Sequence, residues 1–417
     1  MSPNFKRTKL ACYTAYFTMS SIFSLPPLLF MTFQELYNIS YTLLGTLVLT
    51  NFCTQMLVDL IFTLFSKKFN IKKVVRVMPC ITSLGLFIYA LVPNFFPQFA
   101  YLGLVVGTII FSVSAGLSEV LLSPVIAAIP SDNPQKDMSM LHSLYAFGFF
   151  TVVVVSTLFL KIFGNENWMW LTLILGAAPL ISALLFKLSP MPDMSTEETS
   201  AQKAQKNKNR TIGLALCVGC IFLGSCTENT MSNWISTYME NALNIDKALG
   251  DILGMAVFAI LLGITRISYA KFGKNISKFL LFSFICASVC YLVISFSTNK
   301  IFGFIGCILV GIFSSMLWPG TLIMMEENVK GVGVAAYALM ACAGDSGASL
   351  APQLMGIVID NISISQFAIN LSTTLNLTPE QIGLKFGMLI TSIFPILGTF
   401  LVMFIMRYFK KNNSQEI

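Results

Sequence analysis

Long apolar runs, separated by short polar segments, follow one another along the chain from residue 10 to residue 408. Apolar and polar residues do not alternate within these runs, so the runs predict helices rather than strands. A helix needs roughly 20 apolar residues to cross a bilayer, and backbone that faces lipid must be helical or part of a closed barrel. The pattern predicts an all-α integral membrane protein with twelve transmembrane helices, at about residues 10–34, 41–65, 74–93, 98–128, 138–163, 168–187, 211–239, 247–272, 277–297, 300–325, 331–360 and 383–408.

The composition is that of a chain surrounded mostly by lipid. Of the 417 residues, 55% are hydrophobic and only 11% are charged, with a mean hydropathy of +0.77. A soluble protein carries about 25% charged residues. The first apolar run is long enough to span a bilayer and lacks a small-residue cleavage site, so it does not predict a signal peptide that is removed.

Lys and Arg residues are distributed unequally among the predicted loops. If both termini are cytoplasmic, the opposite side of the membrane receives only Lys161, Lys247, Lys300 and Lys385. Because positively charged loops stay inside, this bias predicts a multi-pass protein of the cytoplasmic (inner) membrane with both termini in the cytoplasm. The net charge of +7 then reflects topology, and its spread over separate segments argues against nucleic-acid binding.

The ten cysteines all fall within predicted spans. Cys217 and Cys220 form a C-x-x-C pair, but they lie among small apolar residues of a lipid-embedded helix, which favours packing over metal or redox chemistry. The chain carries no G-x-x-x-x-G-K-[ST] loop for nucleotide phosphates. We therefore predict no metal, no cofactor and no enzymatic activity, and we expect transport to be driven by a gradient.

The chain contains an internal repeat on either side of a polar linker. GLSEVLLSP at 116–124 corresponds to GIFSSMLWP at 311–319, and Asp59 in the second span corresponds to Arg266 in the eighth. Parallel repeats of six helices, with a midplane site between them, are typical of transporters. The predicted parts are a six-helix bundle at 1–190, a flexible cytoplasmic linker at 191–210 and a second six-helix bundle at 211–417.

Several motifs carry a resemblance to a known family, namely SEVLLSPVIAAIP (118–130), LHSLYAFG (141–148), ENTMSNW (228–234), MLWPG (316–320) and AGDSGASLAP (343–352). On these motifs the chain resembles the major facilitator superfamily over its whole length, and within it the bacterial fucose-permease-like branch. The resemblance implies a sugar:proton symporter-like protein whose fourth span lines the cavity. The chain lacks the glycines usual between spans 2 and 3, and it lacks an acid in span 1, which argues against fucose itself.

Between Thr211 and Met239, Glu228 is the only Asp, Glu, Lys, Arg or His residue. A charge at bilayer depth costs roughly 2.5–3.5 kcal/mol on insertion scales. Such a residue therefore faces a water-filled cavity, pairs with another group or is protonated. Counting residues along span 7 places Glu228 beyond the midplane, on the outer side. With Asn229, Asn233 and Trp234 it forms a polar stripe suited to a polyhydroxylated ring; alternatively, the stripe packs against other helices. Other predicted substrate-binding residues are Glu119, Tyr145, Trp318 and Gln55.

Glu119 in span 4 is, like Glu228, an acidic residue within a predicted transmembrane helix. The equivalent residue of the second half is Ser314, so an acid in one half alone favours a task such as proton carriage over a structural hydrogen bond. His142, the only histidine, shares a helix face with Tyr145. A neutral histidine can relay protons, although a structural role is the alternative.

The remaining intramembrane charges are expected to act in coupling or gating. Asp345 lies among small residues in AGDSG, so it is either an acid of the site or part of a gate. Asp59 and Arg266 occupy symmetric places near the cytoplasmic ends of spans 2 and 8. The family resemblance implies that Asp59 belongs to an inner gate, and Asp137 is a candidate partner for Arg266.

These features predict a monomeric secondary active transporter for a small polar solute, a sugar or polyol, coupled to protons through Glu119, Glu228, Asp345 and His142. Its partners are the solute, protons and the bilayer. Export of amphipathic drugs or metabolites is the alternative, since aromatic residues, methionines and buried acids also suit cationic cargo. A non-transporting sensor on the same fold is a further alternative.

Overall fold

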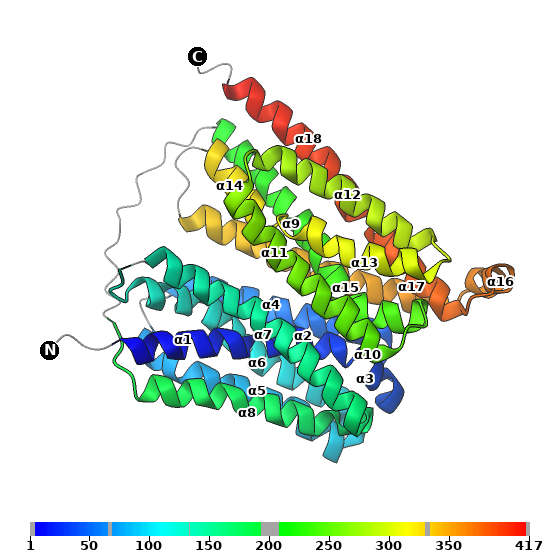
Figure 1. The fold of residues 1–417 in the computed structure, drawn as a ribbon, viewed down its shortest axis with the longest axis horizontal. Helices are drawn as coiled ribbons and strands as arrows, with labels where there is room; N and C mark the ends of the chain where they lie inside the picture. Colours follow the sequence, from blue (N-terminus) through cyan, green and yellow to red (C-terminus); the bar gives the residue numbers. More distant parts are fainter. Residues whose placement is uncertain (1–4, 66–68, 133, 193–207, 330–333, 414–417) are drawn as a thin grey trace. The chain divides into compact units, whose positions relative to one another are not determined.

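The computed structural model describes residues 5–65, 69–132, 134–192, 208–329 and 334–413, and this part of the chain contains helices and no strand (Figure 1). The helices of the first half are α1 Lys6–Met19, α2 Ser21–Leu28, α3 Phe30–Tyr37, α4 Tyr41–Phe65, α5 Ile71–Phe95, α6 Ala100–Ala127, α7 Pro134–Phe163 and α8 Trp168–Lys187, with short 3₁₀ turns at Pro97–Phe99 and Asn165–Asn167.

The helices of the second half are α9 Lys208–Thr237, α10 Lys247–Leu249, α11 Val257–Phe272, α12 Ile276–Phe296, α13 Lys300–Ser314, α14 Pro319–Asn328, α15 Val334–Ser363, α16 Gln366–Leu375, α17 Pro379–Thr391 and α18 Ile393–Asn413. Two π-helical segments, η4 Tyr238–Ala242 and η5 Gly250–Ala256, lie on either side of the connection from α9 to α11. Such segments are rare and frequently mark functional sites.

The predicted fold class is confirmed. Within the described residues, ten helices are long and apolar enough to cross a membrane, and two bent pairs raise the number to twelve if each pair is one span. The first pair, Lys6–Leu28 with Phe30–Tyr37, bends by 50°. Pro26 and Pro27 precede this bend, and each lacks the N–H that an intact helix would use. The second pair is α15 and α16, bent by 78°.

The repeat seen in the sequence has a counterpart in the caps of two helices. In the first half, the side chain of Asn70 accepts a hydrogen bond of 3.1 Å from the backbone N–H of Lys73 at the start of α5. In the second half, Asn275 accepts one of 3.0 Å from Lys278 at the start of α12. An asparagine N-cap satisfies one of the free amides of a helix start, so both helices begin by the same local device.

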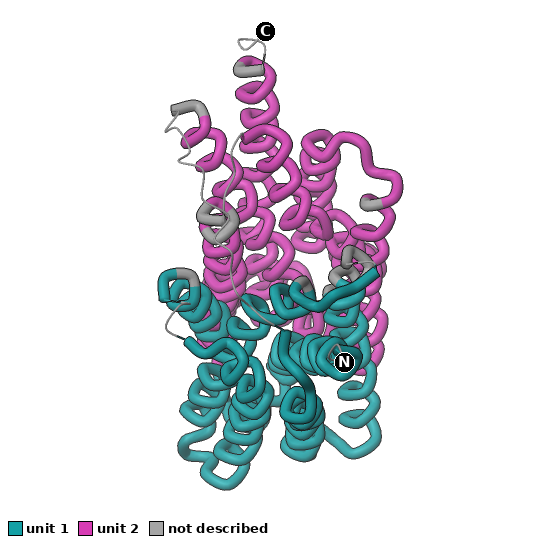
Figure 2. The backbone as a smooth tube through the Cα atoms, turned by 90° about the vertical axis from the view of Figure 1, so that its left-hand side faces the viewer, with its two compact units in different colours: residues 1–39, 50–197 teal, residues 40–49, 198–417 magenta. Residues whose placement is uncertain are grey.

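The structure divides into two compact units, one of residues 1–39 and 50–197 and the other of residues 40–49 and 198–417 (Figure 2). The sequence predicts a division at the linker alone. The start of α4, at 40–49, instead packs with the second unit. Asp360 of α15 accepts hydrogen bonds from the backbone N–H groups of Tyr41, at 3.1 Å, and Thr42, at 2.6 Å. A carboxylate from another helix therefore caps α4 and meets the positive end of its dipole.

Replacing Asp360 with alanine is expected to destabilise the start of α4 by about 1 kcal/mol, because two backbone amides lose their acceptor. Hydrogen exchange followed by mass spectrometry should show faster exchange at residues 41–44. The asparagine-capped start of α5 serves as an internal control, since its cap is local. Equal acceleration at both helix starts would contradict the prediction by indicating general loosening.

Candidate functional site

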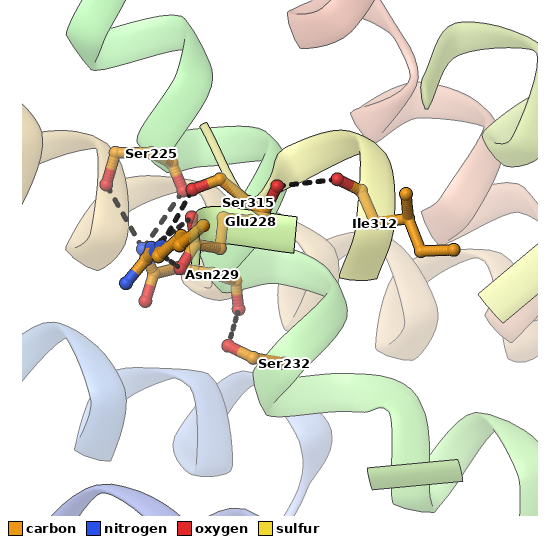
Figure 3. Close-up of polar contacts among 7 residues, drawn as sticks. Ser225, Glu228, Asn229, Ser232, Ile312 and Ser315 are labelled. Carbon is orange, nitrogen blue, oxygen red and sulfur yellow. Dashed lines mark hydrogen bonds and ion pairs between the residues drawn. The ribbon is translucent and has the colours of Figure 1, made fainter. Parts of the chain in front are cut away.

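Glu228 and Arg266 form an ion pair in the second unit (Figure 3). Glu228 lies on α9, and Arg266 extends from α11 so that its Nη2 lies 3.2 Å from Oε1 and 3.4 Å from Oε2 of the carboxylate. The side chains are 19% exposed for Glu228 and 40% exposed for Arg266. The single acid of span 7 is thus neutralised by Arg266 of α11, and both side chains remain accessible.

Arg266 also donates a hydrogen bond to the backbone where the tenth predicted span is interrupted. Pro319 has no N–H, so the carbonyl of Ser315, four residues earlier, lacks its usual helical donor. Arg266 donates from Nε to this carbonyl at 2.8 Å. One guanidinium therefore connects α11 to the carboxylate of α9 and to the freed backbone between α13 and α14, as its planar set of donors allows.

This contact corrects the partner expected for Arg266. The sequence places Glu228 beyond the midplane and Arg266 near the opposite end, with Asp137 as the partner of Arg266. The π segment η4 continues the helical backbone that follows α9 to Ala242, and the carboxylate of Glu228 lies 3.2 Å from Nη2 of Arg266. The long arginine side chain reaches this carboxylate from α11. Arg266 therefore pairs with Glu228 instead of Asp137.

Asp137 has partners of its own in the first unit. Lys9 of α1 donates to Oδ2 of Asp137 at 2.5 Å, and Ser131 donates to the same oxygen at 2.5 Å. These hydrogen bonds, with the charge of Lys9, hold the pKa of Asp137 below its usual value. Asp137 thus ties the start of α7 to α1, which is a different pairing from the one predicted.

The rest of the polar stripe on α9 is bonded mainly within its own helix. The amide of Asn229 donates to the backbone oxygen and to Oγ of Ser225, at 3.1 Å each, and Asn233 donates to the backbone oxygen of Asn229 at 2.8 Å. Trp234 is fully buried and donates from Nε1 to the carbonyl of Pro352 at 3.1 Å. Its ring lies 5.8 Å from that of Tyr41. In this structure Trp234 packs, while Asn229 stays half-buried beside Glu228.

Two glycines of the AGDSG motif allow close packing, one against α9 and the other against Trp318 of the MLWPG motif. A Cβ atom on Gly347 would lie 2.5 Å from the carbonyl oxygen of Phe222, and one on Gly344 would lie 2.2 Å from the ring of Trp318. The first contact brings α15 against α9, and the second places the indole of Trp318 against α15 at Gly344. Asp345, the next residue of α15, is 8% exposed. The structure thus groups Glu228, Trp318 and Asp345 within one unit.

Replacing Gly347 with alanine is expected to lower the free energy of unfolding by about 1–3 kcal/mol, because the added methyl group meets backbone that has little room to move. Gly263→Ala is the matched control, since a Cβ atom there has nothing within 4 Å. Thermal unfolding of the two purified variants tests this. Equal transition temperatures for both would contradict the close packing of α15 on α9.

Glu119 of α6 has a different environment. Its side chain is exposed, and it makes no hydrogen bond or ion pair with the described residues. It lies within electrostatic reach of Tyr16 of α1 and Asp59 of α4. One carboxylate oxygen of Asp59 is itself buried without a hydrogen bond among the described residues.

Two other predicted residues of the first unit lie in packed surroundings. Gln55 is 2% exposed and donates to Oδ1 of Asn51 at 2.9 Å, an oxygen that also accepts from Ser112 at 2.6 Å. Tyr145 is half-buried, and its ring lies 6.5 Å from Tyr16 and 5.6 Å from Phe23. Tyr145 therefore packs against α1 and α2, whereas Asn51, which Gln55 contacts within α4, joins α4 to Ser112 of α6. The side chain of His142 lies outside the described part of the structure.

Sequence reasoning missed Asp251, which is 1% exposed in the π segment η5. It accepts a hydrogen bond from Ser236 and lies 3.8 Å from Lys247. Because Asp251 lies near the predicted start of span 8, the sequence provided no reason to expect a buried side chain there. The hydrophobic pattern does not predict a π segment. Among the described residues, no group of three or more His, Cys, Asp or Glu side chains is placed to hold a metal ion.

The comparisons with known proteins concern the whole fold. The pattern of the Major Facilitator Superfamily matches residues 10–352. A bacterial homologue of the human lysosomal transporter Spinster, inward-facing and occupied, aligns over 99% of this chain and 98% of its own, with a TM-score of 0.74 at 14% identity. A D-xylose-proton symporter aligns over 96% of this chain and 97% of its own, with a TM-score of 0.71 at 13% identity. The nucleoside transporter NupG aligns over 97% of this chain and 98% of its own, with a TM-score of 0.67 at 15% identity. A comparison with curated proteins finds no match.

Proposed function

Because this chain belongs to the Major Facilitator Superfamily and is a membrane transporter, we propose that it carries a small polar solute, a sugar or a related polyol, by proton-coupled alternating access in the fucose-permease-like branch. It acts as a monomer in the cytoplasmic membrane with both termini inside, an orientation that rests on the Lys and Arg bias of the loops.

The observation that carries this proposal is the contrast between the two intramembrane glutamates. Glu228 has Arg266 as a counter-ion, whereas Glu119 is exposed and makes no ion pair with the described residues. A carboxylate at bilayer depth without a counter-ion is costly when charged, so it takes up a proton whenever water leaves its surroundings. Glu119 is therefore the proposed proton carrier, and Asp345 and His142 remain proposed contributors to coupling.

Solute binding is assigned to Glu228, Arg266 and Asn229. A carboxylate and a guanidinium that are both accessible offer acceptors and donors side by side, which matches the hydroxyl groups of a sugar. Two structural neighbours are named for polyhydroxylated solutes, D-xylose and nucleosides, and this supports the same chemical class here. Cationic cargo is less favoured, because Arg266 already neutralises the carboxylate that such cargo would need.

Asp59 is proposed to act in gating, as the family resemblance implies. Its buried carboxylate oxygen has no hydrogen bond among the described residues, so this structure leaves an acceptor available for a donor that arrives in another conformation. An unsatisfied acceptor costs about 1–3 kcal/mol, which is enough to favour a conformation that supplies the donor.

Thermal unfolding of the purified protein against a panel of sugars, polyols, sugar acids and cationic drugs tests the proposed cargo. A true ligand stabilises the folded state by about 2.7 kcal/mol at a hundredfold excess over Kd. We expect a shift with one sugar or polyol, lost in Arg266→Gln and kept in Glu166→Gln, a surface variant. A shift with cationic drugs alone would overturn the sugar class and favour an exporter.

A further inference from the structure

A pocket of about 440 Å³ lies where α11 ends and α12 begins, at the end of the second unit at which α9 starts. Its walls come from the last turns of α11, from the connection at 273–275 and from the first turns of α12. The volume falls within the range of about 300–1,000 Å³ that ligand pockets have. Glu228 and Asn229 are not among its lining residues, so it is separate from the solute site.

The polar part of this pocket is positively charged. Lys274 and Lys278 line it, both are exposed, and neither makes an ion pair with the described residues. The positive end of the α12 dipole lies at the same place, since α12 begins at Ile276. One negative charge opposes them, because Glu327 of α14 lies within electrostatic reach of Tyr269, which also lines the pocket. The lysines leave a net positive charge that suits an anion.

The remaining wall of the pocket is aromatic and open. Phe272 is 71% exposed and Phe282 is 57% exposed, while the rings of Tyr269 and Phe279 pack 4.9 Å apart. One candidate membrane span ends at Tyr269 and the next begins at Ile276, so the pocket lies at the level where lipid headgroups meet acyl chains. A small soluble anion would make no use of the exposed rings, whereas a lipid offers both a charge and an apolar chain.

We propose that this pocket binds an anionic phospholipid. The lipid phosphate lies between Lys274 and Lys278, and an acyl chain runs along Phe272 and Phe282. Basic pockets at helix ends recognise anionic headgroups in this way, and each lysine near the surface adds about 1 kcal/mol of attraction. The proposal stands independently of the transported solute, because Glu228, Asn229 and Arg266 are not among the lining residues of the pocket.

Native mass spectrometry of the full chain in detergent tests the proposal, with phosphatidylglycerol as the anionic lipid, phosphatidylcholine as the neutral lipid and glycerol phosphate as the soluble phosphate. We expect the wild type to retain phosphatidylglycerol in preference to the other probes. Lys274→Gln/Lys278→Gln should weaken that binding by about tenfold or more. The charge-matched control is Lys187→Gln/Lys410→Gln, whose lysines do not line the pocket, and it should bind as the wild type does.

A second variant separates the pocket from general surface charge. Ser268 lines the pocket and is exposed, so Ser268→Trp fills the space while both lysines remain. It should also weaken phosphatidylglycerol binding. Normal binding by Ser268→Trp, an equal loss in the control pair, or equal retention of phosphatidylcholine would each overturn the proposal. Equally strong binding of glycerol phosphate would show that a soluble phosphate, and not a lipid, occupies the site.

Discussion

Replacing Glu119 with glutamine is expected to abolish proton-driven accumulation of the solute while leaving solute exchange across the membrane intact. Glutamine keeps the size of the side chain and resembles the protonated acid, so the protein can still rearrange with solute bound. It cannot release a proton. A pH difference of one unit is worth about 1.4 kcal/mol, or a tenfold concentration ratio for one coupled proton. The accumulation ratio should therefore fall from about ten to about one.

The measurement uses purified protein in vesicles, with the solute found in the thermal panel. Accumulation is followed under an imposed pH gradient, and exchange is followed without one. Glu166→Gln removes an exposed acid from the turn at Asn165–Asn167 and should behave as the wild type. Full accumulation in Glu119→Gln would remove Glu119 from coupling, and loss of exchange as well would make it a binding group.

Breaking the Glu228–Arg266 pair is expected to impair both stability and transport, but in different ways. Arg266→Gln leaves Glu228 without a counter-ion and the Ser315 carbonyl without its donor. Removing one member of a buried pair costs about 3–5 kcal/mol, and the partial exposure of this pair reduces the expected loss to about 1–3 kcal/mol. Glu228→Gln should cost less, because the more exposed Arg266 keeps its bond to Ser315.

The double variant Glu228→Gln/Arg266→Gln separates the structural role from the functional one. Without either charge, stability should recover by about 1–2 kcal/mol relative to the sum of the single losses. Transport should stay reduced at least about tenfold in all three variants, since a lost charged hydrogen bond to the solute is worth about 1.5–3 kcal/mol. Additive stability losses, or transport regained in the double variant, would refute the assignment of this pair to the solute.

Arg266→Lys is the conservative companion of these variants. A lysine keeps the charge and can neutralise Glu228, but it lacks the planar fork that reaches the carboxylate and the Ser315 carbonyl together. Near-normal stability with reduced transport is therefore expected, and transport equal to that of the wild type would show that charge alone suffices.

Much of the fold follows from the sequence because crossing a bilayer is a local requirement. Each span needs its own apolar length, so α5 at Ile71–Phe95 is recognisable as the predicted span 74–93, and α12 at Ile276–Phe296 as the predicted span 277–297. The helix α16 was missed, since it lies outside the long apolar runs. Its start is set by the Ser365 cap and its end by Asn376 in a left-handed conformation.

The candidate site shows the same division between local and distant information. Glu228 is conspicuous in the sequence because an acid in an apolar run has no local compensation. Its partner is not recognisable in this way. Depth counted from predicted span ends separates Glu228 from Arg266, and only the packing of α9 and α11 and the reach of the arginine bring them together. Likewise, the sequence shows that Pro319 leaves the Ser315 carbonyl without its helical donor, but only the structure shows that Arg266 supplies the replacement hydrogen bond.

The sequence by itself determined the membrane class, the number of spans and the identity of the intramembrane charges, because each depends on a short stretch of chain and on the energy of moving it into lipid. The tertiary structure alone decided which charges are neutralised. Ion pairs and caps such as Glu228 with Arg266 and Asp360 with α4 join residues far apart in the chain, and their partners are selected by helix packing, which hydrophobic runs do not encode.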